Sequence, residues 1–215
     1  MAGQRDRAKT IEALMTLAAR QPFNQIGLAD IAKEAGISLA AMREQYASKA
    51  AILSDFSRQI DKAVLEEEVD AEEPTARGRL LDLFMRRFDA LAPYKPALKR
   101  MASDGWRDLL LCLGASRLAA TSNLWLMAAA GIDTAGLRGA LKAEALSVIY
   151  ARAFRVWLKD DDPGLGATMA ELDRAFDRAD GLARRCDDAA RFFAPFFDRL
   201  SRRNRRGEEP TDMAA

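Results

Sequence analysis

The sequence predicts an all-α fold, and two observations predict it. Apolar residues recur at helical spacing in nearly every segment of the 215-residue chain, and the alternation typical of strands is absent. Alanine and leucine are abundant, whereas runs of β-branched residues are missing. With 49% hydrophobic and 30% charged residues, the chain has the composition of a globular protein that can bury a sizeable core.

Glycine, proline and small polar residues divide the chain into predicted helices. These helices cover residues 5–20, 28–35, 39–45, 49–70, 76–92, 95–103, 106–130, 135–159, 166–179 and 182–203. Charge changes sign near Pro74, because residues 51–75 carry a net charge of −6 and residues 76–100 one of +5. We expect these two segments to form solvated faces that attract each other, with a joint between a small N-terminal module and a larger body near Pro74.

The chain contains no histidine, and this narrows its possible functions. Histidine general bases, Ser-His-Asp and Cys-His nucleophiles and histidine metal ligands are excluded, so we predict no catalytic residue, no cofactor and no metal site, and no enzyme. The two cysteines, Cys112 and Cys186, are far apart and are expected to be buried free thiols in a reducing compartment. The longest clean apolar run, 124–132, is about half of a membrane span, and no secretory signal opens the chain. We therefore expect a cytoplasmic protein without stable membrane insertion.

Residues 28–46 form a pattern of two short helices around a glycine. The first helix stops at Gly36, which can take the left-handed conformation that ends helices. Ser38 can cap the second helix, whose inward face is expected to hold Met42 and Tyr46. This is the helix-turn-helix pattern, in which the second helix enters the major groove of DNA. An ordinary helical hairpin without DNA contact has the same spacing, so the pattern alone leaves both interpretations open.

The residues around this pattern favour DNA binding. In order along the chain they are Pro22-Phe23, Asp30-Ile31-Ala32, Ala35-Gly36-Ile37-Ser38 and Tyr46-Ala47-Ser48-Lys49. As a set, they resemble the DNA-binding domain of the TetR family of transcriptional regulators. The resemblance implies a three-helix helix-turn-helix domain over residues 1–53 and a helical ligand-binding and dimerisation body over 54–203. Residues 204–215 have no apolar period and are expected to form a flexible tail. It also implies a homodimer that binds a pseudo-palindromic operator in double-stranded DNA and acts as a ligand-responsive repressor.

Three residues depart from the family's usual pattern. Gly27 stands where the family usually has a Ser or Thr that caps a helix and contacts a phosphate. Leu39 stands where the family often has Lys, Arg or a small polar residue, and Arg43 stands where it often has an aromatic residue. Leu39 and Ala40 can make only apolar contacts, such as with a thymine methyl group, whereas Arg43 can contact guanine or a phosphate. The expected DNA-binding residues are Ser38, Leu39, Ala40 and Arg43 toward the bases, Tyr46, Lys49, Arg5 and Arg7 toward phosphates, and Gly27 at the start of the first helix of the pair.

A second resemblance covers residues 120–178 of the body. Trp125, an Asp133-Thr134 turn, a helix that bears Tyr150, an acidic loop at 160–162 and the segment 172–174 are similar to the TetR-fold lipid-binding accessory proteins of ubiquinone biosynthesis. This resemblance implies an alternative function, a lipid- or quinone-binding accessory protein that does not read DNA. The acidic loop itself is interpreted as a turn and helix start, and not as a metal site.

Large polarizable side chains are frequent in the body. At helical spacing such side chains most often form a packed core, but a cavity between helices lined by them would bind a small apolar ligand. The residues expected to line this pocket are Met85, Phe88, Met101, Trp106, Trp125, Tyr150 and Phe154.

Four phenylalanines lie within residues 192–197 of the last predicted helix. They are too apolar to remain in water, and we expect them to pack on the chain's own body first, on a second copy next, and on a membrane surface last. The residues expected at a dimer interface are Ala189, Phe193, Phe196 and Phe197.

Overall fold

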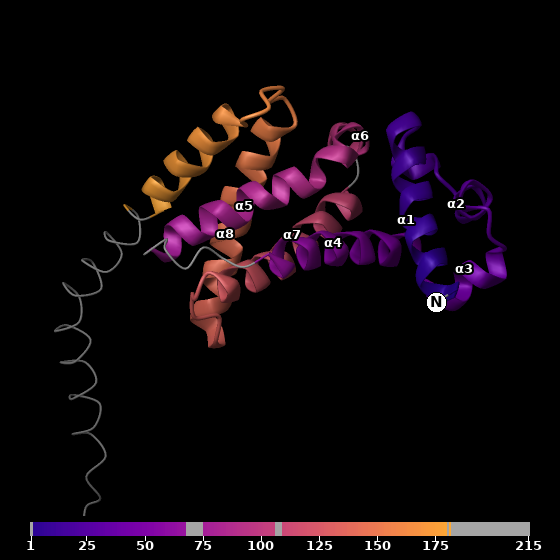
Figure 1. Cartoon of the computed structure of the whole chain (residues 1–215), viewed down its shortest axis with the longest axis horizontal. Helices are drawn as coiled ribbons and strands as arrows, with labels where there is room; N and C mark the ends of the chain where they lie inside the picture. The colour runs from indigo at the N-terminus through magenta and orange to yellow at the C-terminus, as the bar shows by residue number, and fades with distance from the viewer. Residues whose placement is uncertain (1, 68–74, 106–108, 180, 182–215) are drawn as a thin grey trace, which may run out of the picture. The chain divides into compact units, whose positions relative to one another are not determined.

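The computed structural model describes residues 2–67, 75–105, 109–179 and 181, and all regular secondary structure in these ranges is helical. The predicted all-α fold is therefore confirmed. The elements (Figure 1) are α1 (Ala2–Arg20), the 3-10 helix η1 (Phe23–Gln25), α2 (Leu28–Ala35), α3 (Leu39–Gln45), α4 (Lys49–Glu66), α5 (Ala76–Leu91), the 3-10 helix η2 (Ala92–Tyr94), α6 (Lys95–Gly105), α7 (Leu109–Ala129), α8 (Gly136–Trp157) and a helix over 166–179. The chain divides into two compact units, 1–172 and 173–215. In the second unit, the described residues 173–179 and 181 are helical.

Within the described residues, the observed helix bounds lie within two residues of the predicted ones except at two ends. α1 begins at Ala2 and not at residue 5, so three helical residues precede Arg5. α4 ends at Glu66 and not at residue 70, because the backbone of Glu67 is extended. The predicted helix 182–203 and the tail 204–215 lie outside the described residues.

α1 is the central helix of the N-terminal module. It packs against α2, α3 and α4, and it also contacts α6 of the body. Leu14, Ile31 and Ile52, from α1, α2 and α4, are fully buried. In Figure 1, α2 and α3 lie on one side of α1, and α4 leads away from α1 toward the body. The module and the body therefore share α4, which packs on α1 and also on α5 and α7.

The body is built around the pair of helices α7 and α8, which pack along each other. α7 ends before Gly131, which has a left-handed backbone with φ of 76°. Arg79 of α5 donates two hydrogen bonds, of 3.0 and 2.9 Å, to the carbonyl of Ala130 at this end. The large side chains that are almost completely buried in the body include Leu83, Phe84, Phe88, Leu126, Met127 and Trp157.

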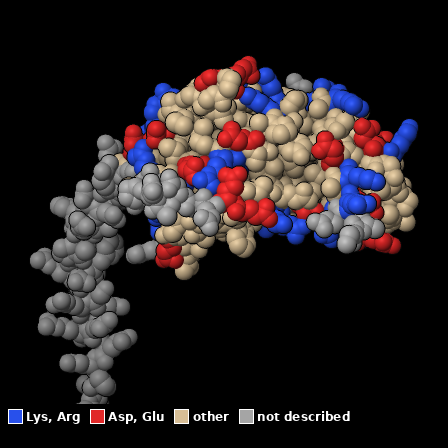
Figure 2. All heavy atoms as spheres, in the orientation of Figure 1, with Lys and Arg blue, Asp and Glu red and all other residues tan. Residues whose placement is uncertain are grey.

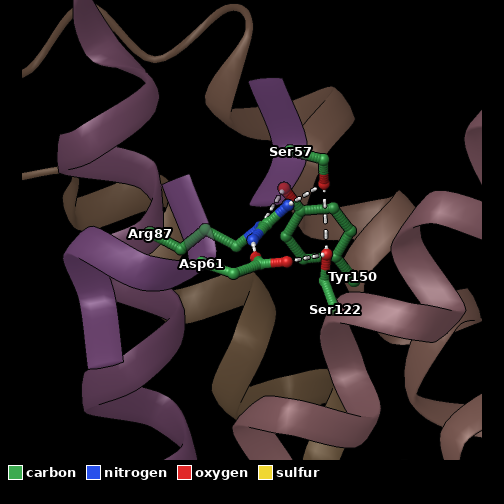
Figure 3. A network of polar contacts seen from close by, with 5 residues as sticks. All are labelled: Ser57, Asp61, Arg87, Ser122 and Tyr150. Carbon is green, nitrogen blue, oxygen red and sulfur yellow. Dashed lines mark hydrogen bonds and ion pairs between the residues drawn. The ribbon is translucent and has the colours of Figure 1, made fainter. Parts of the chain in front are cut away.

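A buried network of polar side chains joins four helices of the body (Figure 3). Asp61 of α4 and Arg87 of α5 form an ion pair, and they are 8% and 5% exposed. Arg87 also donates to the hydroxyl of Tyr150 in α8, at 3.2 Å, and to the hydroxyl of Ser57, at 3.3 Å. Ser122 of α7 donates to Asp61 Oδ2 at 2.7 Å. Ser57 and Asp61 belong to α4, and their partners belong to α5, α7 and α8, so the network links these four helices to one another.

The charged segments on either side of Pro74 meet in two ways. Arg86 pairs with Glu67 at 3.5 Å near the surface, as expected for faces that attract each other. The expectation that both faces are solvated is wrong for Asp61 and Arg87, since this pair is buried. Helical periodicity within one segment could not reveal that these two charges face the same core.

The acidic loop after α8 starts the next helix, as predicted. Asp160 is 7% exposed, and its Oδ2 accepts hydrogen bonds from the backbone N–H of Thr168, at 2.9 Å, and from the Thr168 hydroxyl, at 2.7 Å. The Asp162 carboxylate accepts the backbone N–H of Gly166 at 3.2 Å. These carboxylates thus satisfy N–H groups in the first turn of the helix over 166–179.

Candidate nucleic-acid interface

The turn between α2 and α3 has the geometry that its sequence predicts. Gly36 has φ of 65° and ψ of 34°, the left-handed conformation that glycine adopts at low cost. The backbone N–H of Ile37 donates to the carbonyl of Ala32 at 3.0 Å, and that of Gly36 to Lys33 at 3.2 Å. These two bonds close the end of α2 and set the direction in which the chain enters α3.

α3 presents three of the predicted base-reading residues to solvent. Ser38 caps the helix, because its Oγ accepts the backbone N–H of Ala41 at 3.1 Å. Met42 is 3% exposed and anchors the opposite face in the module core. Leu39, Ala40 and Arg43 are exposed, and their spacing places them on one side of the first turns of α3. Leu39 is 51% exposed, so its side chain is accessible to a binding partner.

Gly27 precedes α2 and offers no side-chain cap. The Asp30 carboxylate partly replaces the cap, since its Oδ2 accepts the backbone N–H of Gly27 at 2.9 Å. A Cβ at position 27 would lie 3.1 Å from this oxygen. The missing cap that the sequence indicates is thus confirmed, and the acid three residues later compensates for part of it.

The Tyr46 side chain points into the protein and links α3 to α4. It is 7% exposed, and its hydroxyl donates to Asp55 Oδ2 at 2.6 Å. Arg58 pairs with the other carboxylate oxygen of Asp55. Burial and the hydrogen bond to Asp55 both raise the pKa of Tyr46 well above its ordinary value. The hydroxyl predicted to contact a phosphate is therefore engaged inside the module.

The ammonium group of Lys49 is also engaged inside the module. Its Nζ donates to the backbone carbonyls of Phe23, at 2.6 Å, and Ile26, at 2.9 Å. It also lies over the Phe23 ring, 4.2 Å from the ring centroid. Lys49 thus ties the first turn of α4 to the end of η1, across more than 20 residues of sequence. The sequence analysis missed this role, because no local signal indicates that these carbonyls lie beside α4.

Asp55 makes the stability of the module depend on pH. Burial alone would raise the pKa of Asp55, but hydrogen bonds from Tyr46 and Arg58 and the positive charges of Arg58 and Arg7 outweigh it, so the pKa lies below the ordinary 3.8. A carboxyl with a lowered pKa stabilises the folded state fully above its unfolded-state pKa of about 3.9, and this contribution is lost as the pH falls through the folded-state pKa.

We expect the difference in free energy of unfolding between the wild type and Asp55→Asn to be constant near neutral pH and to shrink below about pH 4. Urea unfolding of both proteins at pH 7 and pH 3 measures it. A difference that is the same at both pH values would contradict the role of the Asp55 charge.

The predicted pocket residues are only partly brought together. Phe88, Tyr150 and Phe154 belong to one aromatic cluster: Phe88 and Tyr150 stack at a centroid distance of 5.5 Å, and Tyr150 and Phe154 at 6.0 Å. Trp125 is 61% exposed and faces away from this core. Met85 and Met101 are half-buried, and Trp106 lies outside the described residues. One surface hollow lies beside the end of α8 and another between α1 and α2, and neither of these two is lined by a predicted pocket residue.

The structure reveals an apolar face on α8 that the sequence analysis did not single out. Leu137, Leu141 and Val148 are 76%, 61% and 63% exposed. Their spacing along α8 puts them on one stripe, opposite the buried stripe that includes Ala143 and Tyr150. Two apolar stripes on one helix were visible in the sequence, but only the packing shows which stripe is covered. The predicted interface residues Ala189, Phe193, Phe196 and Phe197 lie outside the described residues.

Neither the surface charge nor the grouping of metal-ligand residues indicates a second candidate site among the described residues. Figure 2 shows acidic and basic side chains interspersed over the visible face of the molecule. Within the ranges given above, no three cysteine or acidic side chains are grouped so that they could hold a metal ion. No helix in those ranges is long and apolar enough to span a bilayer.

Comparison with solved structures identifies the fold. A TetR transcriptional regulator from Nitrosomonas europaea matches 80% of this chain and 97% of its own, with a TM-score of 0.61 and 23% identity. A TetR transcriptional regulator from Rhodococcus sp. RHA1 matches 82% of this chain and 96% of its own, with a TM-score of 0.57 and 16% identity. NalD of Pseudomonas aeruginosa, the secondary repressor of the MexAB-OprM multidrug efflux pump, matches 81% of this chain and 96% of its own, with a TM-score of 0.50 and 15% identity. No protein-family model and no curated protein matches the chain.

Proposed function

We propose that this chain, which has the fold of TetR-family transcriptional regulators, is a one-component transcriptional regulator that binds a pseudo-palindromic operator as a homodimer. The observation that carries the proposal is the capped helix α3, which presents Leu39, Ala40 and Arg43 outward. A helix held in this way by a glycine turn can enter the major groove with its first turns toward the bases. We further propose that it acts as a repressor, because NalD of Pseudomonas aeruginosa, which has the same fold, is a repressor.

The side chains on α3 define what such a helix can read. Leu39 and Ala40 offer only methyl and methylene groups, which suit the C5-methyl group of thymine. The guanidinium group of Arg43 presents its N–H donors as a fork, and this geometry matches the O6 and N7 acceptors of guanine. We therefore propose half-sites in which thymine and guanine lie a few base pairs apart.

Selection from random DNA duplexes tests the function without a guess about the operator. We expect enrichment of a two-fold site whose half-sites are about one helical turn, roughly 34 Å, or more apart. If nothing is enriched, the alternative of a lipid- or quinone-binding accessory protein gains support, and solvent extraction of the purified protein then identifies its ligand.

Arg43→Ala is expected to weaken binding to the selected site by about 1–3 kcal/mol and to relax the preference for guanine. The removed guanidinium is the only cation on the exposed face of α3. Fluorescence anisotropy with the selected duplex and with a duplex that carries the substituted base measures both effects. Lys99→Ala, which removes an exposed charge from α6, is the matched control and is expected to change neither. An unchanged base preference in Arg43→Ala would contradict the reading of guanine.

We propose that the second copy packs on the exposed apolar face of α8. A two-fold interface uses the same patch on both subunits, so a stripe of Leu137, Leu141 and Val148 can be covered by its own copy. Exposed leucine and valine side chains in such a row are otherwise unfavourable in water. We also propose that residues 189–197 extend this interface.

The body is proposed to bind a small apolar ligand near the aromatic cluster of Phe88, Tyr150 and Phe154. The side chains there are large and polarizable, and their rearrangement is the simplest way to admit such a ligand. The dimer can place its two N-terminal modules at a separation that fits DNA or at one that does not. A ligand that binds one of these two states more tightly shifts the equilibrium toward it, and the change in DNA affinity is limited by the difference between the ligand's affinities for the two states.

A further inference from the structure

The residues expected to bind DNA phosphates differ in whether their polar atoms are available. The Tyr46 hydroxyl is bonded to Asp55 in a side chain that is 7% exposed. Lys49 uses two of its three N–H donors on the carbonyls of Phe23 and Ile26. The polar groups of both side chains therefore already form hydrogen bonds inside the protein, and binding to a phosphate would disturb these bonds.

The helix-turn-helix itself has no surplus of positive charge to attract DNA. Residues 28–46 contain two basic residues, Lys33 and Arg43, and three acidic ones. The neighbouring Arg20 forms an ion pair of 3.5 Å with Glu34 of α2. Because phosphate neutralisation supplies most of the non-specific affinity for DNA, positive charge from elsewhere in the module is needed.

The first turns of α1 supply this charge beside α3. Residues 2–9 hold three bases, Arg5, Arg7 and Lys9, and a single acid. α1 contacts both α3 and α4, and in Figure 1 its N-terminal end lies next to α3. Since α1 is helical from Ala2, these side chains project from a rigid element.

Helical geometry separates the three bases onto two faces. Arg5 and Lys9 are four residues apart and share one face, and Lys9 lines the hollow between α1 and α2 together with Glu34. Arg7 projects from roughly the opposite side of the helix. Its charge acts on Tyr46 and Asp55, where α3 passes into α4, and its side chain is exposed to solvent.

We propose that Arg7 of α1 binds a DNA phosphate beside each half-site, and that Tyr46 and Lys49 position α3 without contacting DNA. This inference rests on the proposed function, because it assigns the phosphate contact of the same interface. Arg7 belongs to the N-terminal end of α1, which lies beside α3. An arginine can bind two phosphate oxygens at once.

The experiment measures the slope of log K against log salt concentration for the full chain and the selected duplex. Each phosphate contact contributes about 0.9 to this slope, so Arg7→Ala, present twice in a dimer, is expected to flatten it by about 1.8. Between 50 and 200 mM salt, the wild type is then expected to lose about tenfold more affinity than the variant. Lys9→Ala, from the other face of the same helix, is the matched control and is expected to change the slope by much less.

A parallel variant, Lys49→Met, tests the positioning role. We expect a lower unfolding midpoint, because two backbone carbonyls lose their donor, together with a salt slope equal to that of the wild type. If the wild type binds its duplex and Arg7→Ala leaves the slope unchanged, or if Lys49→Met flattens the slope in its place, the assignment to Arg7 is overturned while the proposed function stands. If the wild type binds no duplex at any salt concentration, the proposed function fails and this assignment fails with it.

Discussion

Arg87→Ala is expected to lower the free energy of unfolding by about 3–5 kcal/mol. The substitution leaves the Asp61 carboxylate buried without its cation, and it also removes the donors that reach Tyr150 and Ser57. A charge of this kind is costly because neither water nor a counter-ion can approach it. Urea denaturation followed by circular dichroism measures the loss.

The double variant Asp61→Leu, Arg87→Met is the matched control for this network. It removes both charges and fills similar volume, so we expect it to stay within about 1–2 kcal/mol of the wild type, or to exceed it. A loss of less than about 1 kcal/mol in Arg87→Ala would contradict the buried ion pair. A loss in the double variant as large as in Arg87→Ala would instead show that the network's hydrogen bonds, more than its charge, hold the four helices together.

Leu141→Asp is expected to convert the dimer into a monomer and to abolish tight binding to the two-fold site. Leu141 lies between Leu137 and Val148 on the exposed stripe of α8. A two-fold interface receives the substitution twice, so two carboxylates would be buried against apolar side chains, at a cost of several kcal/mol. Light scattering at micromolar concentration, together with anisotropy on full and half-site duplexes, measures both results.

Lys99→Asp, which changes an exposed residue of α6, is the control for added negative charge and is expected to remain dimeric. Because Leu141 is 61% exposed in the single chain, Leu141→Asp is expected to leave the stability of the monomer nearly unchanged. A wild type that is monomeric at micromolar concentration would contradict both the α8 interface and the two-half-site model. A Leu141→Asp dimer would move the interface elsewhere, for example to residues 189–197.

The sequence by itself determined the features that depend on neighbours within one or two turns. Helix periods predicted nearly every element, Gly36 predicted the end of α2, and Ser38 predicted the cap of α3. Each of these rests on hydrogen bonds between residues three to five positions apart, such as Ala41 to Ser38 and Ile37 to Ala32. Backbone conformation and short-range bonding are encoded locally, so no knowledge of the other helices was needed.

Only the tertiary structure decided what the longer side chains do. Lys49 and Tyr46 have the residue types of phosphate ligands, but their polar atoms bond to Phe23, Ile26 and Asp55. Likewise, Arg87 is buried against Asp61 and Trp125 is exposed, the reverse of what their hydropathies suggest. A long side chain can satisfy its charge with any partner within its reach, and which partner is there depends on how the helices pack. The same dependence decides which of the two apolar stripes of α8 lies in the core and which remains for another molecule.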